Sequence, residues 1–348
     1  MESNYYLEFE NKFRGSRQEI IENLSIYDPL IEIITNNDSS LKLIDIGSGR
    51  GEWLQKCKDR NINCVGIENN QGMIEFCINN KLKVLEGDAY KRLSELDSES
   101  IKVITIFHMI EHLEHHKLLK LFEQCNRVLS EDGVLIIETP SIDSLLVSTK
   151  SFYIDPTHIN HINSDLICFD IAKSGFTNVK TYFIHGGPLA NASPLKITRI
   201  LNGVAQDLCI IATKSEKTFQ SLISKSSSWE SNLDIGMTTL DAAIEHDLKF
   251  EEILNNLENS KDYYSNLIND QSTYISHLQK EISLLKSQLK VFIFVFNFMR
   301  TLLKPRLLFK YLRKVTLNFC NKIFNILIRF KVIRYYLTTK RGLLLMNF

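Results

Sequence analysis

Short apolar runs alternate with stretches of helical periodicity through the first two thirds of the chain. The runs are rich in Ile, Val and Leu and are short, so each predicts a buried strand. They cover residues 41–46, 63–68, 82–85, 101–107, 134–138, 179–184 and 208–213, with helices expected over 73–80 and 118–129. Because strands that alternate with helices form parallel sheets, the pattern predicts an α/β fold with a doubly wound, mostly parallel seven-stranded sheet. We expect the last two strands to pair as a hairpin at its edge.

Residues 7–35 carry apolar groups at helical spacing ahead of the first strand. Asp28-Pro29 divides this segment into two predicted helices, because proline is favoured in the first turn of a helix. The polar turn Phe13-Arg14-Gly15-Ser16 precedes the first helix and has two interpretations. Ser16 can cap the helix, or the turn can form a lid over a ligand, with Arg14 facing a carboxylate.

A seven-residue repeat runs from about residue 240 to residue 289, a stretch with neither Pro nor Gly. The a positions are Leu254, Lys261, Ile268, Ile275, Ile282 and Leu289, and the d positions are Leu257, Tyr264, Gln271, Leu278 and Leu285. The repeat predicts a coiled coil within residues 236–291. Ile at a with Leu at d favours a parallel dimer, while the polar residues Lys261 and Gln271 leave a trimer open. The alternative is one long helix folded back on the preceding domain.

Residues 292–348 combine apolar groups every three or four positions with basic residues beside them. No uninterrupted apolar run approaches the roughly 18 residues that a membrane-spanning helix needs. Basic helices with an apolar face lie in the membrane interface and are attracted to anionic lipid, which predicts an amphipathic membrane-binding tail. The alternatives are RNA binding, which the wide apolar face disfavours, and a helical bundle that buries this face against protein.

Charge is distributed unevenly along the 348 residues. Residues 290–348 hold 13 Lys/Arg and no Asp/Glu, so the rest of the chain carries 28 basic against 41 acidic groups. The net charge of zero therefore conceals a basic tail suited to an anionic partner. A stretch rich in Ser and Lys follows the α/β domain and precedes the predicted coiled coil. The predicted organisation is a globular domain over 1–214, a linker over 215–235, the coiled coil over 236–291 and the tail over 292–348.

Seven scattered cysteines form no C-x-x-C pair, so neither a disulfide framework nor a thiolate zinc site is indicated. The acidic, polar N-terminal segment lacks the features of a secretory signal. Together with the basic tail, these features predict a protein of the reducing cytoplasm that is peripheral on the inner membrane.

Candidate chemistry begins where the first strand ends, in LKLIDIGSGRGEWL (residues 41–54). The spacing Asp45-x-Gly47-x-Gly49-x-Gly51 places the third glycine one residue earlier than in the dinucleotide-binding G-x-G-x-x-G. Glycines let the backbone approach a ligand closely, and Asp45 can orient the turn or meet an ammonium group. The turn therefore suits a cofactor that has a nucleoside and a charged amino-acid tail but no phosphate.

Acidic residues also follow the next two strands. Glu68 ends the second strand, where a carboxylate can bind both hydroxyls of a ribose. Asp88 follows the third strand in Gly87-Asp88-Ala89 and can accept a hydrogen bond from an adenine amino group. Each acid alone is an ordinary turn residue, but three at successive strand ends favour a nucleoside-binding site.

The densest polar cluster follows the fourth strand, in His108-Met109-Ile110-Glu111-His112. If a helical turn begins here, His108, Glu111 and His112 lie on one face. They can bind a divalent metal, or His112 can act as a general base that Glu111 orients. A third interpretation is a helix start without a catalytic role.

A second polar cluster lies in residues 151–161, after the fifth strand. The row Asp155-Pro156-Thr157-His158 cannot form a helix interior, which predicts a loop over the strand ends. His158 or His161 could complete a site with His112, and the alternative is a capped loop with incidental histidines.

The segments FRGS, DIGSGRGEW, GIENN, GDA, FHMIEHL, RVLSEDGVLIIETP and SFYIDPTH resemble, in this order, a branch of the class I S-adenosylmethionine (SAM)-dependent methyltransferases. The resemblance covers roughly residues 10–213. The branch includes the O-antigen chain terminators, which cap a growing lipopolysaccharide chain by methylating its terminal sugar. The resemblance implies a Rossmann-like class I methyltransferase fold and SAM as cofactor. The implied cofactor residues are Arg14, Gly15, Asp45, Gly47, Gly49, Gly51, Glu68, Asn69, Asp88, Ala89 and His108, and the implied catalytic residues are His112, His108, Glu111, His158 and Asp155.

The histidine-rich segment also resembles the metal-binding E-x-x-E-H of ubiquinone-pathway O-methyltransferases and small-RNA 3′-end methyltransferases. The candidate ligands of a divalent metal would be His108, Glu111, His112 and His158. Because His108 departs from that pattern, we expect the general-base role of His112 instead.

A catalytic head, a coiled coil and a membrane-binding end together resemble the chain terminators. The implied partners are a lipid-linked polysaccharide acceptor, an anionic membrane surface, glycosyltransferases and further copies of the chain in a dimer or trimer. We expect no nucleic acid among the partners. No kinase domain fits in the chain, so capping would use methyl alone. The alternatives are O-methylation of a membrane-bound small molecule such as a quinone precursor, and a membrane-tethered scaffold with an inactive SAM fold. The intact acids and glycines disfavour the scaffold.

Overall fold

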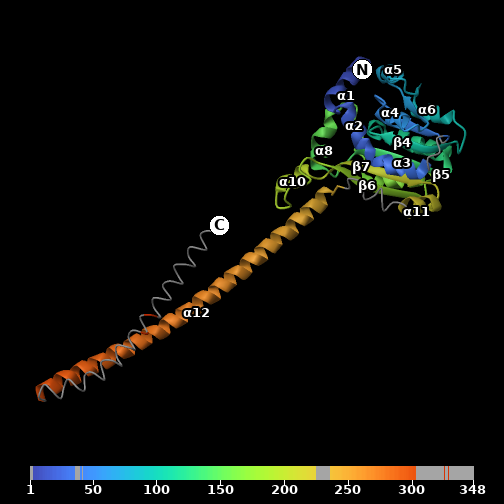
Figure 1. The fold of residues 1–348 in the computed structure, drawn as a ribbon. Coiled ribbons are helices and arrows are strands. Elements are labelled where there is room, and N and C mark those ends of the chain that lie inside the picture. The colour runs from blue at the N-terminus through green and yellow to red at the C-terminus, as the bar shows by residue number, and fades with distance from the viewer. Residues whose placement is uncertain are drawn as a thin grey trace. The chain divides into compact units, whose positions relative to one another are not determined.

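The structure is a computed structural model that describes residues 3–35, 40, 42–224, 236–302, 325 and 328. Its elements are shown in Figure 1. The chain divides into two units, Met1–Glu252 and Ile253–Phe348.

The first unit is built on a seven-stranded sheet with the strand order β3-β2-β1-β4-β5-β7-β6. The strands are β1 (Leu43–Ile46), β2 (Cys64–Glu68), β3 (Val84–Glu86), β4 (Ile101–Phe107), β5 (Leu129–Pro140), β6 (Asn178–Gly186) and β7 (Ala205–Thr213). Strands β1 to β5 pair in parallel, and β7 pairs antiparallel with both β5 and β6. The doubly wound, mostly parallel seven-stranded sheet is confirmed, and its last two strands pair antiparallel at the edge.

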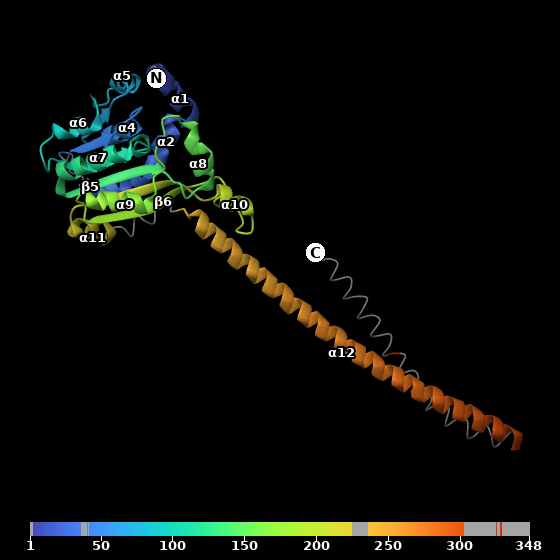
Figure 2. The same cartoon turned by 180° about the vertical axis from the view of Figure 1, so that it is seen from behind.

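Successive strand residues alternate between two buried layers. In β4, Val103 joins the layer beneath α3 (Asp28–Thr35) and α4 (Glu52–Asp59), while Ile104 joins the layer beneath α7 (His115–Val128) and α9 (Ser164–Lys173). Figures 1 and 2 show α3 on one side of the sheet and α7 with α9 on the other. Because helices cover both faces, the strands are continuous apolar runs rather than alternating ones.

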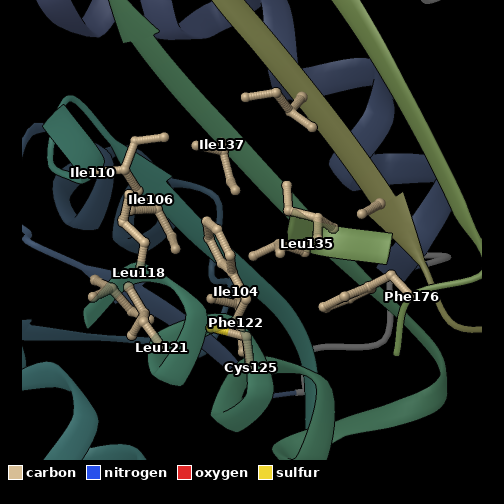
Figure 3. Close-up of a cluster of buried hydrophobic side chains, with 14 of the residues drawn as sticks. Ile104, Ile106, Ile110, Leu118, Leu121, Phe122, Cys125, Leu135, Ile137 and Phe176 are labelled. Carbon is tan, nitrogen blue, oxygen red and sulfur yellow. The ribbon is translucent and has the colours of Figure 1, made fainter. Parts of the chain in front are cut away.

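Helix α7 illustrates how helical spacing fits the sheet. Its buried residues recur every three or four positions and contact the β4 and β5 side chains (Figure 3). They are Leu118, Leu121, Phe122 and Cys125, and they face Ile104, Ile106, Leu135 and Ile137. Phe122 is fully buried, so its replacement by Ala should cost about 3–5 kcal/mol of unfolding free energy.

The remaining helices of this unit are short. They are α1 (Ser3–Phe13), α2 (Arg17–Asn23), η1 (Leu24–Tyr27), α5 (Gln71–Asn79), α6 (Ala89–Ser94), η2 (Ile110–His112), α8 (Leu145–Thr149), η3 (Ser151–Ile154), α10 (Ile197–Asn202) and α11 (Glu216–Ser224). Pro29 lies in the first turn of α3, as predicted. The sequence did not predict α1, because this helix buries the charged Glu10 and exposes Phe13 and so lacks an apolar stripe.

The predicted linker over 215–235 is wrong for its first part. Residues 216–224 form α11, and Leu222 is buried in the layer that contains α3 and α4. One apolar face is enough to anchor a short helix, even where Ser and Lys dominate the composition. Residues 225–235 lie outside the described residues.

Helix α12 runs without a break from Thr239 to Leu302. Among its predicted seam residues, Leu254, Leu257, Tyr264, Ile268 and Ile275 are between 37% and 64% exposed, whereas Leu278 is buried. In the described parts of the chain, no helix has the length and apolar character to cross a membrane. Most of the predicted tail, residues 303–324, 326–327 and 329–348, lies outside the described residues.

Candidate functional site

The turn between β1 and α4 depends on backbone conformations that favour glycine. Gly47, Gly49 and Gly51 have φ angles of 74°, 51° and 73°. A Cβ atom on Gly47 would lie 2.6 Å from Cγ of Met109. Gly47 and Gly49 line a cavity of about 710 Å³, which we call the large cavity. Gly51 does not line it, because it lies against Leu82, where a Cβ would approach to 2.6 Å.

Glu68 holds this turn in place from the end of β2. Its carboxylate accepts hydrogen bonds from the backbone N–H groups of Gly49 at 2.8 Å and of Asn69 and Asn70 at 2.9 Å. The side chain is 8% exposed and lines the large cavity. One carboxylate therefore joins the glycine turn to the loop after β2 and still faces the space where a ribose would lie.

Most of the predicted cofactor residues meet at the large cavity. Its lining includes Arg14, Gly47, Gly49, Glu68, Asn69, Asp88, Ala89 and His108. Asp88 also caps α6, accepting from the N–H of Lys91 at 3.0 Å. Gly15 lies outside the lining, in the turn between α1 and α2. Sequence reasoning missed Met73, Tyr90 and Leu113 in the lining, since apolar residues beside a polar motif resemble ordinary core positions.

Asp45 lies in a neighbouring cavity of about 240 Å³, which also reaches Arg14, Gly47 and His108. The carboxyl group accepts a hydrogen bond from Thr105 Oγ1 at 2.7 Å. Burial raises the pKa of Asp45 to about 7, although the Thr105 hydrogen bond lowers it. A cationic group bound beside Asp45 would favour the ionised form.

The turn after α1 contains the helix cap that its sequence predicted, and its Arg14 borders three cavities. Ser16 caps α2 in a capping box with Glu19. Arg14 lines the large cavity, the Asp45 cavity and a third cavity described below, and it donates to Glu10 at 3.1 Å. Its guanidinium is thus placed where it could face the carboxylate of a cofactor.

His108 belongs to a polar network at the edge of four neighbouring strands. Its Nε2 lies 3.0 Å from Oε1 of Glu138 and 3.7 Å from Oδ1 of Asp207, while Nδ1 of His185 lies 2.9 Å from Oδ2 of Asp207. Both histidines have positive φ angles, 50° and 56°. Burial lowers the pKa of each imidazole, but the carboxylates raise it overall, to about 10 for His108 and about 9 for His185. The carboxylates of Glu111, Glu138 and Asp207 therefore favour the protonated form of these histidines.

The helical turn expected to begin at His108 does not form in residues 108–112, which the structure describes. The positive φ of His108 interrupts it, and only Ile110–His112 form a 3-10 turn. Glu111 is fully buried and accepts from Thr139 Oγ1 at 3.0 Å. Nδ1 of His108 lies 3.6 Å from Oε1 of Glu111, but Nε2 turns toward Glu138. The candidate ligand atoms therefore form two groups, one of Glu111, His112 and His158 and one of His108, Glu138 and Asp207.

His112 and His158 form the other half of the site. Their ring centroids are 4.6 Å apart. Nδ1 of His112 lies 2.8 Å from Oγ1 of Thr157, which lies 2.6 Å from Oδ1 of Asp155. Nδ1 of His158 lies 2.7 Å from the carbonyl oxygen of Phe152. Burial lowers the pKa of His158, so this imidazole is neutral near pH 7.

A third cavity, of about 180 Å³, opens between α1 and the loop after β5, and we call it the small cavity. His112, His158 and Asp155 line it, together with Phe9 and Phe13 of α1. The lining residues that it shares with the large cavity are Glu10, Arg14, His108 and His112. His161 does not line the described cavities; it packs on Phe152 with ring centroids 4.0 Å apart.

The glycine turn, the strand-end acids and this sheet order suit a nucleoside cofactor, and comparison with known proteins identifies the family. The model of the methyltransferase domain family matches residues 17–181. A SAM-dependent methyltransferase from Archaeoglobus fulgidus is 31% identical, with a TM-score of 0.52, and the match covers 60% of this chain and 99% of that one. The chain belongs to the SAM-dependent methyltransferases. SAM is its cofactor.

Two further solved structures are more distant. A SAM-dependent methyltransferase from Thermotoga maritima, described as a possible histamine N-methyltransferase, is 19% identical over 62% of this chain and all of that chain, with a TM-score of 0.43. Phosphoethanolamine N-methyltransferase 2 from Haemonchus contortus, solved with SAM, is 15% identical over 60% of each chain, with a TM-score of 0.42. The search of curated proteins found no match.

Proposed function

We propose that this methyltransferase transfers the methyl group of SAM to a hydroxyl group, with His112 as general base. The supporting observation is that the large cavity, which contains most of the predicted SAM residues, and the small cavity share His112 in their linings. A donor in one cavity and an acceptor in the other would therefore react beside this imidazole. Alignment of two reactants is itself a major source of rate enhancement.

The reaction needs few chemical groups. The acceptor oxygen attacks the methyl carbon, the new O–C bond forms as the C–S bond breaks, and the sulfur retains its electron pair in S-adenosylhomocysteine. The hydroxyl proton passes to Nε2 of His112, since Nδ1 contacts Thr157. A positioned base of this kind typically contributes roughly 10²–10⁴ to the rate.

A divalent metal also fits the residues at this point. Ligand atoms of Glu111, His112 and His158 lie within 4.8 Å of one another, and carboxylate with imidazole is a common ligand set. Buried Oε1 of Glu111 lacks a hydrogen-bond partner among the described residues. Nδ1 of His158 faces a carbonyl, an arrangement typical of metal-ligating histidines. A bound metal would polarise the acceptor hydroxyl; His108, which turns to Glu138, would not be a ligand.

We propose as acceptor the terminal sugar of a lipid-linked surface polysaccharide of the O-antigen type, whose methylation would end chain elongation. The small cavity is below the roughly 300–1,000 Å³ of sites for drug-sized ligands. It therefore suits one terminal unit of a long chain better than a bulky compound. Its aromatic and carboxylate lining is also suited to a sugar ring, which has apolar faces and hydroxyl groups.

Label transfer from methyl-labelled SAM to isolated membranes tests this acceptor. The expected result is label in the polysaccharide fraction, with a single O-methyl group on the terminal sugar by nuclear magnetic resonance. Label in the quinone fraction instead would support a membrane-bound small molecule as the acceptor. Protein carrying His112→Ala serves as the inactive control.

We also propose that α12 forms a coiled coil between copies of the chain and that residues 292–348 bind the inner membrane. The support is the exposure of the seam residues Leu254, Leu257 and Ile268, whereas Leu278 of the same seam is buried. Val291, Ile293 and Phe294 are 63%, 49% and 73% exposed. Deleting 292–348 should release an active enzyme from anionic vesicles. Vesicle binding by the full chain should weaken as salt screens its basic residues. Equal binding to neutral and anionic vesicles would contradict the electrostatic contribution.

A further inference from the structure

We infer that Thr157, itself held by Asp155, is a positioning residue that sets the tautomer of His112. The inference rests on the proposed role of His112. It assigns a chemical function to the loop after β5, whose Thr157 lines the large cavity and whose Asp155 and His158 line the small cavity.

The donors in this chain of contacts can be assigned by counting protons. Oγ1 of Thr157 and Oδ1 of Asp155 are 2.6 Å apart, and a carboxylate can only accept. The single hydroxyl proton of Thr157 must therefore lie between these two oxygens. Oγ1 then has only lone pairs to offer His112, so the 2.8 Å contact with Nδ1 requires the proton on Nδ1.

A neutral imidazole with its proton on Nδ1 has a lone pair on Nε2. That is the form in which His112 can accept a proton from a hydroxyl group in the small cavity. The opposite tautomer would place its lone pair toward Thr157 and its N–H toward the acceptor. Thr157 thus selects the tautomer that can act as a base.

The loop itself is built to present this threonine. The backbone N–H of Thr157 donates to the same Oδ1 of Asp155 at 2.8 Å, so one carboxylate oxygen fixes both the main chain and the hydroxyl. The backbone N–H groups of Ile159 and Asn160 donate to the carbonyl of Glu111, each at 3.0 Å. These bonds join the loop directly to the turn that carries His112.

Long-range ¹H–¹⁵N spectra of the full-length protein report the tautomer directly, without any acceptor. The His112 signals are assigned by their loss in His112→Gln. We expect the Nδ1–H form in the wild type, a mixture of forms in Thr157→Val, and the Nδ1–H form again in Thr157→Ser, which retains the hydroxyl. Thr149→Val is a matched control, because Thr149 is exposed on α8 and its hydroxyl bonds only the carbonyl of Leu145 among the described contacts.

Kinetics supply the second measurement. In Thr157→Val, kcat at saturating SAM should fall about tenfold to a hundredfold, and Thr157→Ser should recover most of the rate. Because Thr157 also lines the large cavity, the SAM Kd of each variant is measured first and sets the SAM concentration used. An unchanged His112 tautomer in Thr157→Val, or equal losses of kcat in the Val and Ser variants at saturating SAM, would overturn the inference. Because the spectra need no acceptor, an incorrect acceptor assignment would leave the tautomer result standing.

Discussion

The carboxylate of Glu68 accepts a hydrogen bond from the backbone N–H of Gly49, 2.8 Å away. The acid that ends β2 thus reaches across to the turn that follows β1. These strands are neighbours in parallel register, so both loops leave the sheet at the same edge. Glu68 thus holds the glycine turn and also lines the large cavity, in which we propose that SAM binds.

Replacing Glu68 with Ala should weaken SAM binding about tenfold to a hundredfold, because the ribose loses an acceptor and the glycine turn loses its support. Isothermal titration calorimetry measures the change. Glu86→Ala is a matched control, because Glu86 pairs with Glu68 across the sheet but is exposed. Unchanged SAM affinity in Glu68→Ala would reject the cofactor role of this residue.

The pKa of Asp45 predicts a pH dependence of SAM binding. Burial raises this pKa from its ordinary 3.8 to about 7, so the unliganded protein holds a proton there below neutral pH. If the SAM ammonium group binds beside Asp45, it requires the carboxylate, and binding must release that proton. SAM affinity should fall by up to about tenfold as the pH falls from 8 to 6.

In Asp45→Asn the affinity should be lower at pH 8 and nearly independent of pH over this range. Calorimetry in buffers of different ionisation enthalpy would also detect the released proton. A pH dependence that is the same in the wild type and in Asp45→Asn would place the titrating group elsewhere.

Much of the fold and of the lining of the large cavity follows from local sequence. Buried parallel strands give continuous apolar runs, and a turn such as Gly47 to Gly51 needs glycine whatever surrounds it. The linkage of Thr157 to His112 spans 45 positions and depends on how the loop folds over the sheet, which no periodicity records. The orientation of His108 toward Glu138 was equally hidden, because it results from one positive φ angle and from partners on β5 and β7. Helix α1 was missed because the ion pairs of Glu10 with Arg14 and Arg50 replace an apolar stripe.

The base and metal roles of the His112 site lead to different responses to chelator. We expect turnover to be unaffected by EDTA and to fall about a hundredfold to ten-thousandfold in His112→Ala, with SAM still bound. His161→Ala should be near normal, because His161 is on the same loop but packs on Phe152. Loss of turnover with EDTA, restored by added Mn²⁺, would instead favour a metal held by Glu111, His112 and His158.

The seam of α12 leads to a prediction about assembly. Ile275 and Ile282 occupy successive a positions, and Ile275 is 37% exposed. If a second copy covers this seam, aspartate at both positions would be buried among apolar groups at a large free-energy cost. The variant with both Ile275→Asp and Ile282→Asp should be monomeric. The control, Ser276→Asp with Ser283→Asp, adds the same charge at exposed positions next to these residues in the sequence and should keep the wild-type assembly. Light scattering compares the masses, and a single helix without a partner would give the same mass for all three proteins.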